Sequence, residues 1–290
     1  MNRRAFNKLS ALGAGALIAP GPLLAFAEKP KMALQLWTVR ELIEEDLEKT
    51  IDFVSHIGFS AVETAFWPEG ISFERAAKVI AQYGMDVCSI HNDLPTKENQ
   101  NQLLEMAEAY RNTKMIWHGW PEDVRYQSDA GIAELAEIYN EANAFFKSHE
   151  LQFGLHNHWW EFQPHADGQL PFDILKEQID EDIFFEIDTY WTKVAGQDPA
   201  EIVKKYGTRA PFLHIKDGPA VYNEALEEDN PDPMVAVGQG TLDFPAIAKA
   251  GKINTKWMIV ELDNCATDMM DAVRESYVYL KKNKMAKGRI

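Results

Sequence analysis

Three features are scarce in this sequence: cysteines, basic residues and, beyond residue 27, long apolar runs. Cys88 and Cys265 are the only two cysteines. Both lie in or directly after apolar, strand-like runs, so we expect buried thiols rather than a disulfide, and their spacing forms no metal-binding motif. Residues 28–290 contain no apolar run that would span a membrane, no low-complexity segment and no linker rich in glycine, serine or proline.

Basic residues are outnumbered, with 29 Lys and Arg against 45 Asp and Glu. Removal of the first 27 residues would take away Arg3, Arg4 and Lys8 and no acid, which leaves 26 basic residues and a net charge of −19. Nucleic acid is strongly acidic and is recognised by basic surfaces, so this composition argues against a nucleic-acid partner.

The first 27 residues have the features of an export signal. Asn2-Arg3-Arg4-Ala5-Phe6-Asn7-Lys8 is a twin-arginine signature, a weakly apolar stretch follows it, and Ala25-Phe26-Ala27 offers a cleavage site between small residues. We expect residues 1–27 to be a twin-arginine signal peptide and the mature protein to be periplasmic, with no membrane association after cleavage. The alternative is a disordered or helical N-terminal arm.

Apolar, strand-like runs alternate with amphipathic, helix-like stretches every 25 to 35 residues or so. The strand-like runs are Met32–Thr38, Ala61–Ala65, Asp86–His91, Lys114–His118, Gln152–His158, Ile183–Thr189, Phe212–Lys216 and Trp257–Leu262. The helix-like stretches are Leu47–Ile57, Phe73–Tyr83, Asn101–Tyr110, Ile132–Phe146, Phe172–Ile179, Ala200–Tyr206, Phe244–Ala250 and Met269–Leu280. This alternation predicts an α/β fold, a (β/α)₈ TIM barrel in which residues 28–290 form a single domain.

Glycines and one long loop fit this prediction. Gly58, Gly84, Gly207 and Gly251 follow helical stretches, where a residue with positive φ commonly ends a helix. The irregular segment 218–243 follows the seventh strand, and a loop of that length on a barrel is typically an active-site cover.

Catalytic groups in a parallel barrel come from the carboxyl ends of the strands. Five of the eight histidines, namely His91, His118, His156, His158 and His214, stand at such ends. Three carboxylates and one imidazole, Glu161, Asp188, His214 and Glu261, follow strands five to eight. Together they would form a mostly oxygen site for one divalent metal ion, suited to Mn²⁺, Mg²⁺ or Co²⁺, with Zn²⁺ as a further candidate. Singly, each has a structural alternative: Asp188 as a helix cap, His214 as a core histidine, Glu261 as a partner of a lysine.

Several motifs in the second half of the chain occur together in one known family. They read Ile187-Asp188-Thr189-Tyr190-Trp191, Gly196-Gln197-Asp198-Pro199, His214-Ile215-Lys216-Asp217, Gly238-Gln239-Gly240-Thr241-Leu242-Asp243 and Val260-Glu261-Leu262-Asp263. In these motifs the chain resembles the xylose-isomerase-like TIM barrels of the sugar phosphate isomerase/epimerase type, in particular the branch with His-Asn-His-x-x-Glu-Phe.

The resemblance implies a metal held by Glu, Asp, His and Glu from strands five to eight. Asp188, His214 and Glu261 match this pattern. On the fifth strand many relatives have the Glu where this chain has His156, and Glu161 follows five residues later, so we predict Glu161 as the ligand with His156 as the alternative. The implied chemistry is proton abstraction next to a carbonyl, with Glu161, Glu261, His156, His158 or Lys216 as base or as the group that neutralises an oxyanion.

Aromatic residues near the strand ends suit the C–H faces of a sugar. We assign Trp37, Trp120 and Trp191, together with His91 and His118, to substrate binding. Because an exported protein would rarely meet phosphorylated sugars, and because the sequence has no Gly-rich phosphate loop and no Arg cluster at strand ends, we expect a non-phosphorylated sugar, keto sugar or glycoside as the substrate.

The predicted reaction is isomerisation, epimerisation or cleavage of a 3-keto-glycoside by a lyase- or hydrolase-type enzyme, and a homo-oligomer is compatible with the sequence. The main alternative is a non-catalytic periplasmic sugar-binding protein. Metal-dependent phosphodiester cleavage would need more metal ligands and a basic surface, and a two-carboxylate glycosidase would not need His214.

Overall fold

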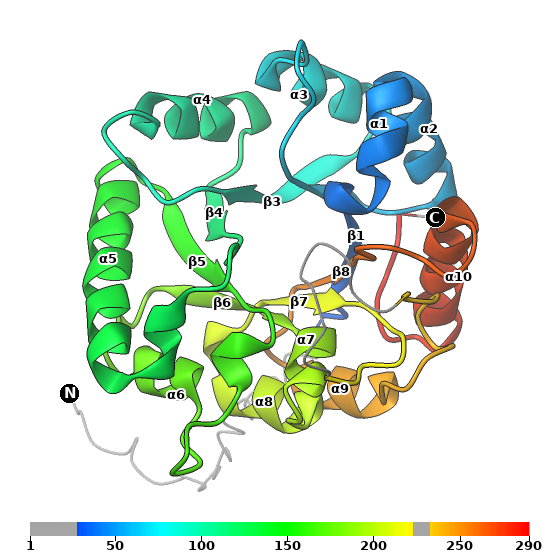
Figure 1. Ribbon diagram of the computed structural model, residues 1–290. Coiled ribbons are helices and arrows are strands. Elements are labelled where there is room, and N and C mark those ends of the chain that lie inside the picture. The colour runs from blue at the N-terminus through cyan, green and yellow to red at the C-terminus, as the bar shows by residue number, and fades with distance from the viewer. Residues whose placement is uncertain (1–27, 223–232, 290) are drawn as a thin grey trace, which may run out of the picture.

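The computed structural model describes residues 28–222 and 233–289, which form a closed barrel of eight parallel strands surrounded by helices (Figure 1). Each strand pairs with its neighbour in the chain, and β1 pairs with β8 to close the barrel. The strands are β1 Lys31–Gln35, β2 Ala61–Thr64, β3 Asp86–Asn92, β4 Lys114–Trp117, β5 Gln152–His156, β6 Phe184–Asp188, β7 Phe212–Ile215 and β8 Trp257–Val260. The predicted single-domain TIM barrel is confirmed. The predicted signal peptide lies in residues 1–27, outside the described residues.

The eight predicted helices are present on the outside of the barrel (Figure 1). They are α2 Leu47–Ile57, α3 Phe73–Gln82, α4 Gln100–Tyr110, α5 Asp129–Ser148, α6 Pro171–Lys176, α8 Pro199–Tyr206, α9 Phe244–Gly251 and α10 Met269–Lys282. Side-chain oxygens cap several of them, as Asp46 does for α2 and Ser128 for α5. Gly58 ends α2 with φ of 113° as predicted, whereas Gly251 is the last helical residue of α9, where a Cβ would collide with the Thr255 hydroxyl.

Short elements at the carboxyl ends of the strands were not predicted. They are η1 Leu36–Val39, α1 Arg40–Glu45, η2 Val124–Gln127, η3 Trp160–Phe162 and α7 Thr189–Val194, while a further short element, η4 Gly207–Arg209, precedes β7. As a result β1, β5 and β6 end one to three residues earlier than predicted. On β6 the cause is visible: the Oδ1 of Asp188 accepts hydrogen bonds from the backbone N–H groups of Tyr190 and Trp191, so it caps α7 at the point where the strand ends.

The barrel interior is layered. Alternate residues of a strand face inward, so successive inward positions on β6 are Phe184, Glu186 and Asp188. The lowest interior layer is an apolar cluster of Ala33, Ala61, Cys88, Ile116, Phe184, Phe212 and Ile259. One step higher the interior is polar, although bulky branched residues usually fill a TIM barrel at this level. The top layer, at the carboxyl ends, lies beside the pocket described below.

The two thiols differ in their surroundings. Cys88 is buried in the lowest interior layer, as predicted, but Cys265 is only half-buried, because it lies on the β8–α10 loop rather than in a strand; neither forms a disulfide. Within residues 28–222 and 233–289, no helix combines the length and the apolar character that crossing a membrane requires.

Candidate metal centre

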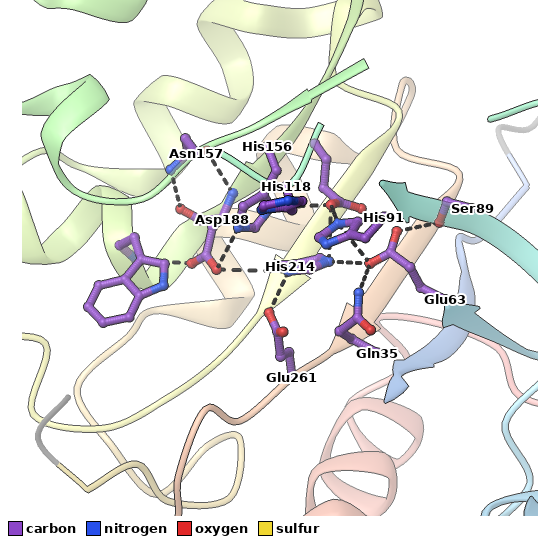
Figure 2. A network of polar contacts seen from close by, with 12 residues as sticks. Gln35, Glu63, Ser89, His91, His118, His156, Asn157, Asp188, His214 and Glu261 are labelled. Carbon is purple, nitrogen blue, oxygen red and sulfur yellow. Dashed lines mark hydrogen bonds and ion pairs between the residues drawn. The ribbon is translucent and has the colours of Figure 1, made fainter. Parts of the chain in front are cut away.

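Asp188, His214 and Glu261 come together at the carboxyl ends of β6, β7 and β8 (Figure 2). One ligand atom from each lies within 4.8 Å of the others. The Nδ1 of His214 is 2.7 Å from the Oε2 of Glu261 and 3.9 Å from the Oδ2 of Asp188. All three side chains are buried. The structure therefore places three of the four predicted metal ligands around one point.

Two atoms of this group, the Oδ2 of Asp188 and the Nδ1 of His214, make no hydrogen bond of good geometry with the described residues. Their close neighbours are ionisable groups, the ammonium of Lys216 for Asp188 and the carboxylate of Glu261 for His214. A buried polar atom without a partner costs about 1–3 kcal/mol, so such atoms usually face a ligand or an ion. The other oxygen of Asp188 is occupied by the backbone of α7, which fixes the direction of Oδ2. A carboxylate oxygen and an imidazole nitrogen aimed at one point, with a second carboxylate beside them, fit a divalent cation.

Lys216, also at the end of β7, extends into the same place. Its ammonium lies 2.8 Å from the Oε2 of Glu261, 2.8 Å from the Oδ2 of Asp263 and 3.2 Å from the Oδ2 of Asp188. Burial lowers the pKa of Lys216, but the three carboxylates raise it well above its usual value. Lys216 is thus a fixed positive charge rather than a proton acceptor, which favours oxyanion neutralisation over its other predicted role as a base.

Burial and the neighbouring Lys216 and His214 also shift the pKa of the carboxylates Asp188 and Glu261. Burial raises the pKa of Asp188 to about 6, against the opposing effects of Lys216 and His214. Burial also acts to raise the pKa of Glu261, but Lys216 and His214 more than compensate and hold it well below its usual value. The site therefore depends on nearby positive charge to keep its carboxylates ionised.

A second group of charged side chains lies in the polar interior layer; Figure 2 shows its Glu63 on the far side of His214 from Asp188. The Oε1 of Glu63 accepts from the Nε2 of His214 at 2.6 Å and from the amide of Gln35 at 2.8 Å, and its other oxygen accepts from the Ser89 hydroxyl. Glu63 and His214 are completely buried. Glu63 therefore binds the face of His214 that points away from the candidate metal centre.

Glu186 is the second carboxylate of this layer and is also fully buried. Three imidazole nitrogens surround its Oε2: His91 Nε2 at 2.6 Å, His214 Nε2 at 3.1 Å and His156 Nδ1 at 3.2 Å. His91, predicted to bind substrate, is held here by Glu186, although its ring also lines the pocket above. Burial lowers the pKa of His91 to about 4.

The fifth strand presents His156 toward the candidate metal centre and Glu161 away from it. The Nε2 of His156 is 3.9 Å from the Oδ2 of Asp188. The Oε2 of Glu161 instead accepts a hydrogen bond from the backbone N–H of His158 at 2.9 Å, because the chain turns into η3 directly after β5. The structure thus does not bring Glu161 to the other three predicted ligands or into the pocket lining.

Asn157, between the two histidines, explains part of the His-Asn-His motif. Its side-chain oxygen accepts from the backbone N–H of Asp188 at 2.9 Å, and its amide donates to the carbonyl of Asp188. The motif therefore joins the end of β5 to the end of β6, while His158 stacks on the ring of Trp160 at 4.5 Å. The Nδ1 of His158 has no hydrogen-bond partner, and burial lowers the pKa of this ring well below its usual value.

A cavity of about 180 Å³ opens above the candidate metal centre. All five predicted substrate-binding residues line it, and so do four of the five predicted catalytic residues, Glu161 being the exception. The lining residues are Trp37, Arg40, Ala65, Phe66, His91, His118, Trp120, His156, His158, Trp191, Lys216, Glu261 and Asp263. A wider cavity of about 740 Å³ lies near the amino ends of the strands, beside Asp86, Lys114, Phe212 and Trp257, at the end of a barrel where side chains usually serve stability.

The aromatic and imidazole groups of this pocket are held in place. Trp37 is 40% exposed, and the guanidinium of Arg40 lies 4.4 Å from its ring centre. The Nδ1 of His118 accepts from the backbone N–H of Trp120, so its Nε2 carries a proton toward Asp93 at 3.2 Å. Trp191 is buried beneath the ammonium of Lys216, which lies 5.4 Å from its ring centre.

The loop after β7 is anchored by Asp217. Its Oδ2 accepts from the backbone N–H groups of Gly238 and Gly240 at 2.8 and 2.9 Å, and its Oδ1 accepts from those of Gly218 and Leu242. A Cβ at Gly240 would collide with this carboxylate. The Gly-x-Gly segment therefore closes over Asp217. Residues 223–232 of the predicted cover loop lie outside the described residues.

Comparison with known proteins identifies the family. The model of the xylose isomerase-like TIM barrel family matches residues 51–283. The chain belongs to this family. A search of curated proteins found no match. Among solved structures, members of the same fold include a sugar phosphate isomerase/epimerase from Parabacteroides distasonis ATCC 8503, with 22% identity, TM-score 0.72 and coverage of 94% of this chain and 99% of that one.

Two further structures share the fold with this xylose isomerase-like barrel. The probable 3-DHS dehydratase AsbF from Bacillus anthracis has 15% identity and TM-score 0.71 over 87% of this chain and 98% of that one. The IolI protein, whose structure contains a bound zinc atom, has 13% identity and TM-score 0.63 over 87% and 98%. At these identities the likeness establishes the fold.

Sequence reasoning missed four residues of this family member's site. Glu186 is two residues before Asp188 on β6, so the alternation of side chains along a strand predicts that both face the barrel interior. Glu63 lies within the predicted strand run Ala61–Ala65, where a charge inside an apolar run was a signal for it. Asp263 and Phe66 lie on loops directly after strands, where the sequence carries no periodic signal.

Proposed function

We propose that this protein is a divalent-metal-dependent enzyme that removes a proton next to the carbonyl of a non-phosphorylated sugar, keto sugar or glycoside. The observation that carries the proposal is the convergence of Asp188, His214 and Glu261 at one point beside an aromatic-lined pocket, which Glu261 lines. Family membership supports an enzyme of this kind, because its structural neighbours include sugar phosphate isomerase/epimerases.

The metal, held by Asp188, His214 and Glu261, would polarise the carbonyl of the substrate and stabilise negative charge on its oxygen. Lys216 adds a fixed positive charge beside the carboxylate oxygens of Asp188 and Glu261. His158 is the base that the geometry favours, since it lines the pocket and its ring is fixed against Trp160. Return of the proton to the other face of the same carbon gives an epimer, and its return to the neighbouring carbon gives an isomer.

A glycoside with a ketone in its ring offers a third outcome from the same first step. The base first removes the proton from the carbon that joins the ketone to the anomeric carbon. The electron pair left on that carbon can then expel the glycosidic oxygen, which takes up a proton as it leaves. Water added to the resulting double bond then gives the keto sugar. The pocket is therefore compatible with isomerase, epimerase and lyase-type chemistry.

The charges in the pocket support an unphosphorylated substrate. Arg40 and Lys216 are the only Lys or Arg side chains among its described lining residues. Arg40 stacks on Trp37 and donates to the backbone carbonyls of Trp37 and Asp263. Lys216 is surrounded by three carboxylates. Both cations are therefore already engaged by carbonyl or carboxylate oxygens, which leaves neither of them free for a phosphate group, whereas neutral hydroxyls and aromatic faces suit each other. Export through the twin-arginine signal to the periplasm remains part of the proposal.

The test is solvent-deuterium incorporation into a panel of keto sugars and keto-glycosides, with metal content measured on the same purified protein. We expect one divalent ion per chain and deuterium at the carbon next to the carbonyl for at least one compound. A protein that binds sugars but catalyses no exchange on any of them would instead be a periplasmic sugar-binding protein, and full retention of protium in product made in D₂O would exclude an enolising mechanism.

A further inference from the structure

His156 belongs to the inner group of His91, Glu186 and His214, and it also borders the candidate metal centre on the side of Asp188. Its Nε2 is 3.9 Å from the Oδ2 of Asp188, the same separation as that between Asp188 Oδ2 and His214 Nδ1. The His156 and His214 rings are 4.6 Å apart, centre to centre. The two imidazoles thus approach the Oδ2 of Asp188 from β5 and β7, the strands on either side of β6, which carries Asp188.

We propose that His156, through Nε2, is the fifth-strand metal ligand of this protein, and that the buried carboxylates Glu186 and Glu63 are positioning residues for its two histidine ligands. The proposal rests on the metal dependence proposed above and assigns residues that the family resemblance leaves open. Glu161 then has a structural role, because its carboxylate accepts a hydrogen bond from the backbone N–H of His158 and stabilises the turn after β5.

The protons of the two imidazoles follow from the carboxylates below them. An ionised carboxylate only accepts hydrogen bonds, so a ring nitrogen within hydrogen-bond distance of one carries the proton. His156 Nδ1 is 3.2 Å from Glu186 Oε2, which leaves the lone pair on Nε2. His214 Nε2 is 2.6 Å from Glu63 Oε1, which leaves Nδ1 for the ion. The two rings use opposite nitrogens, yet His156 Nε2 and His214 Nδ1 are each 3.9 Å from the same oxygen of Asp188.

His91 completes this arrangement without being a ligand. Its Nε2 is 2.6 Å from Glu186 Oε2, and its ring stacks on that of His214 at 5.3 Å. This contact fixes Glu186 between His91 and His156. Metal-bound histidines commonly donate their second N–H to a carboxylate, and loss of such a partner typically weakens metal binding about 10- to 100-fold.

The inner layer is better explained as support than as a second metal site. Its histidine nitrogens already lie 2.6 to 3.2 Å from carboxylate oxygens, as hydrogen-bond donors do. Neither Glu63 nor Glu186 lines the pocket, whereas Glu261 and His156 do, so an ion held by the inner carboxylates would have no open position for water or substrate.

This assignment changes the class of metal. With His156 in place of Glu161 the ligands become two neutral imidazoles and two carboxylates, instead of one imidazole and three carboxylates. Their combined charge of −2 balances a divalent ion. Imidazole nitrogens suit Zn²⁺, Co²⁺, Fe²⁺ or Mn²⁺, whereas Mg²⁺ prefers oxygen ligands. We therefore expect Co²⁺ and Zn²⁺ to bind more tightly than Mg²⁺.

The test uses the mature full-length protein, stripped of metal and titrated with Co²⁺, with affinity, stoichiometry and the visible absorption spectrum as readouts. The variants are His156→Gln, Glu186→Gln and the matched Glu161→Gln, each compared by circular dichroism and thermal unfolding. We expect one Co²⁺ per wild-type chain, a loss of affinity above about 100-fold with an altered spectrum for His156→Gln, and a loss of about 10- to 100-fold for Glu186→Gln. Glu161→Gln should leave affinity and spectrum unchanged.

A second measurement works without any variant. Pulsed electron paramagnetic resonance of wild-type protein loaded with Mn²⁺ or Cu²⁺ detects histidine nitrogens bound to the ion, and we expect two. One nitrogen, or an affinity that falls for Glu161→Gln and not for His156→Gln, would overturn the assignment of His156 while leaving the metal-dependent function intact. Two Co²⁺ ions per chain would overturn the supporting role of the inner layer. A wild-type chain that binds no metal would refute the proposed function itself.

Discussion

The carboxylate of Glu63 contacts the imidazole of His214 inside the barrel, although the two residues are 151 positions apart in the chain. The Oε1 of Glu63 is 2.6 Å from the Nε2 of His214. Neither side chain has any exposed surface. A buried carboxylate needs hydrogen-bond donors, and Glu63 has three, from Gln35, Ser89 and His214. This contact links the polar interior layer, one step below the pocket, to the candidate metal centre.

The first prediction concerns that contact. In Glu63→Gln an amide replaces one acceptor oxygen, so either His214 or Ser89 faces a donor, and the orientation of His214 is no longer fixed. We expect divalent-metal affinity to fall about 10- to 100-fold, measured by competition with a chelator. Glu98→Gln, which changes an exposed carboxylate, is the matched control. Equal affinities in the two variants would show that Glu63 does not support the metal centre.

Removal of the Lys216 ammonium should make folding more dependent on metal. Lys216→Met leaves Asp188, Glu261 and Asp263 facing one another without their cation, and breaking such a buried ion pair typically costs about 3–5 kcal/mol. A bound divalent ion would restore part of that stability by mass action. The increase in Tm on adding metal should therefore be larger in the variant than in wild type.

Lys193→Met is the control for this effect, because the Lys193 ammonium donates only to a backbone carbonyl, that of Thr241. Its metal-induced change in Tm should match wild type. A Lys216→Met protein whose Tm rises less than that of wild type on adding metal would contradict the account.

Phe66 offers a test of the pocket rim. It is 54% exposed, lines the pocket and meets the ring of His118 edge-on at 5.3 Å between ring centres. Because aromatic contacts contribute about 0.5–1.5 kcal/mol, Phe66→Ala should weaken binding of the best sugar from the exchange panel roughly 2- to 10-fold, measured by calorimetry. Stability should hardly change. Ile253→Ala, 74% exposed and outside this pocket, should leave sugar binding unaltered.

The loop after β7 should depend on Asp217 far more than on Asp243. Asp217→Ala leaves four backbone N–H groups without their acceptor, so we expect the free energy of unfolding to fall by at least about 3 kcal/mol in urea titrations. Asp243 caps α9 through a single bond to the N–H of Ala246, and its replacement by Ala should cost about 1 kcal/mol. Equal losses would mean that the Gly-x-Gly segment is held by something other than Asp217.

The fold could be predicted from the sequence because apolar periodicity determines which segments become strands and helices, and eight alternations leave few topologies open. The short elements at the strand ends could not be predicted in this way. Thr189–Val194 is rich in β-branched and aromatic residues and was read partly as strand, yet the Asp188 carboxylate starts a helix there. Local hydrogen bonding outweighed side-chain preference at this position.

The site was predictable only where its residues lie at strand ends. Asp188, His214 and Glu261 lie there, and the structure brings them together. The direction of Glu161 depends on a single turn of 3₁₀ helix, which sequence periodicity does not reveal. Glu186 and Glu63 lie on strands β6 and β2 and point into the barrel interior, which is usually apolar. Their partners, His91, His156, His214 and Gln35, come from other strands, so only the closed barrel shows how these charges are compensated.

Removal and restoration of the metal during proton exchange tests most directly whether the metal centre enolises a sugar. Methyl 3-keto-glucoside, or the most active compound of the panel, is incubated in D₂O with wild-type protein, with chelator-stripped protein, and with stripped protein resupplied with Co²⁺ or Mn²⁺, while the C–H signal next to the carbonyl is followed by NMR. We predict exchange that stops on stripping, returns with the added ion, and does not return in Asp188→Asn. Exchange at the same rate in stripped protein, or its absence in fully metal-loaded protein, would contradict the claim that this centre enolises a sugar.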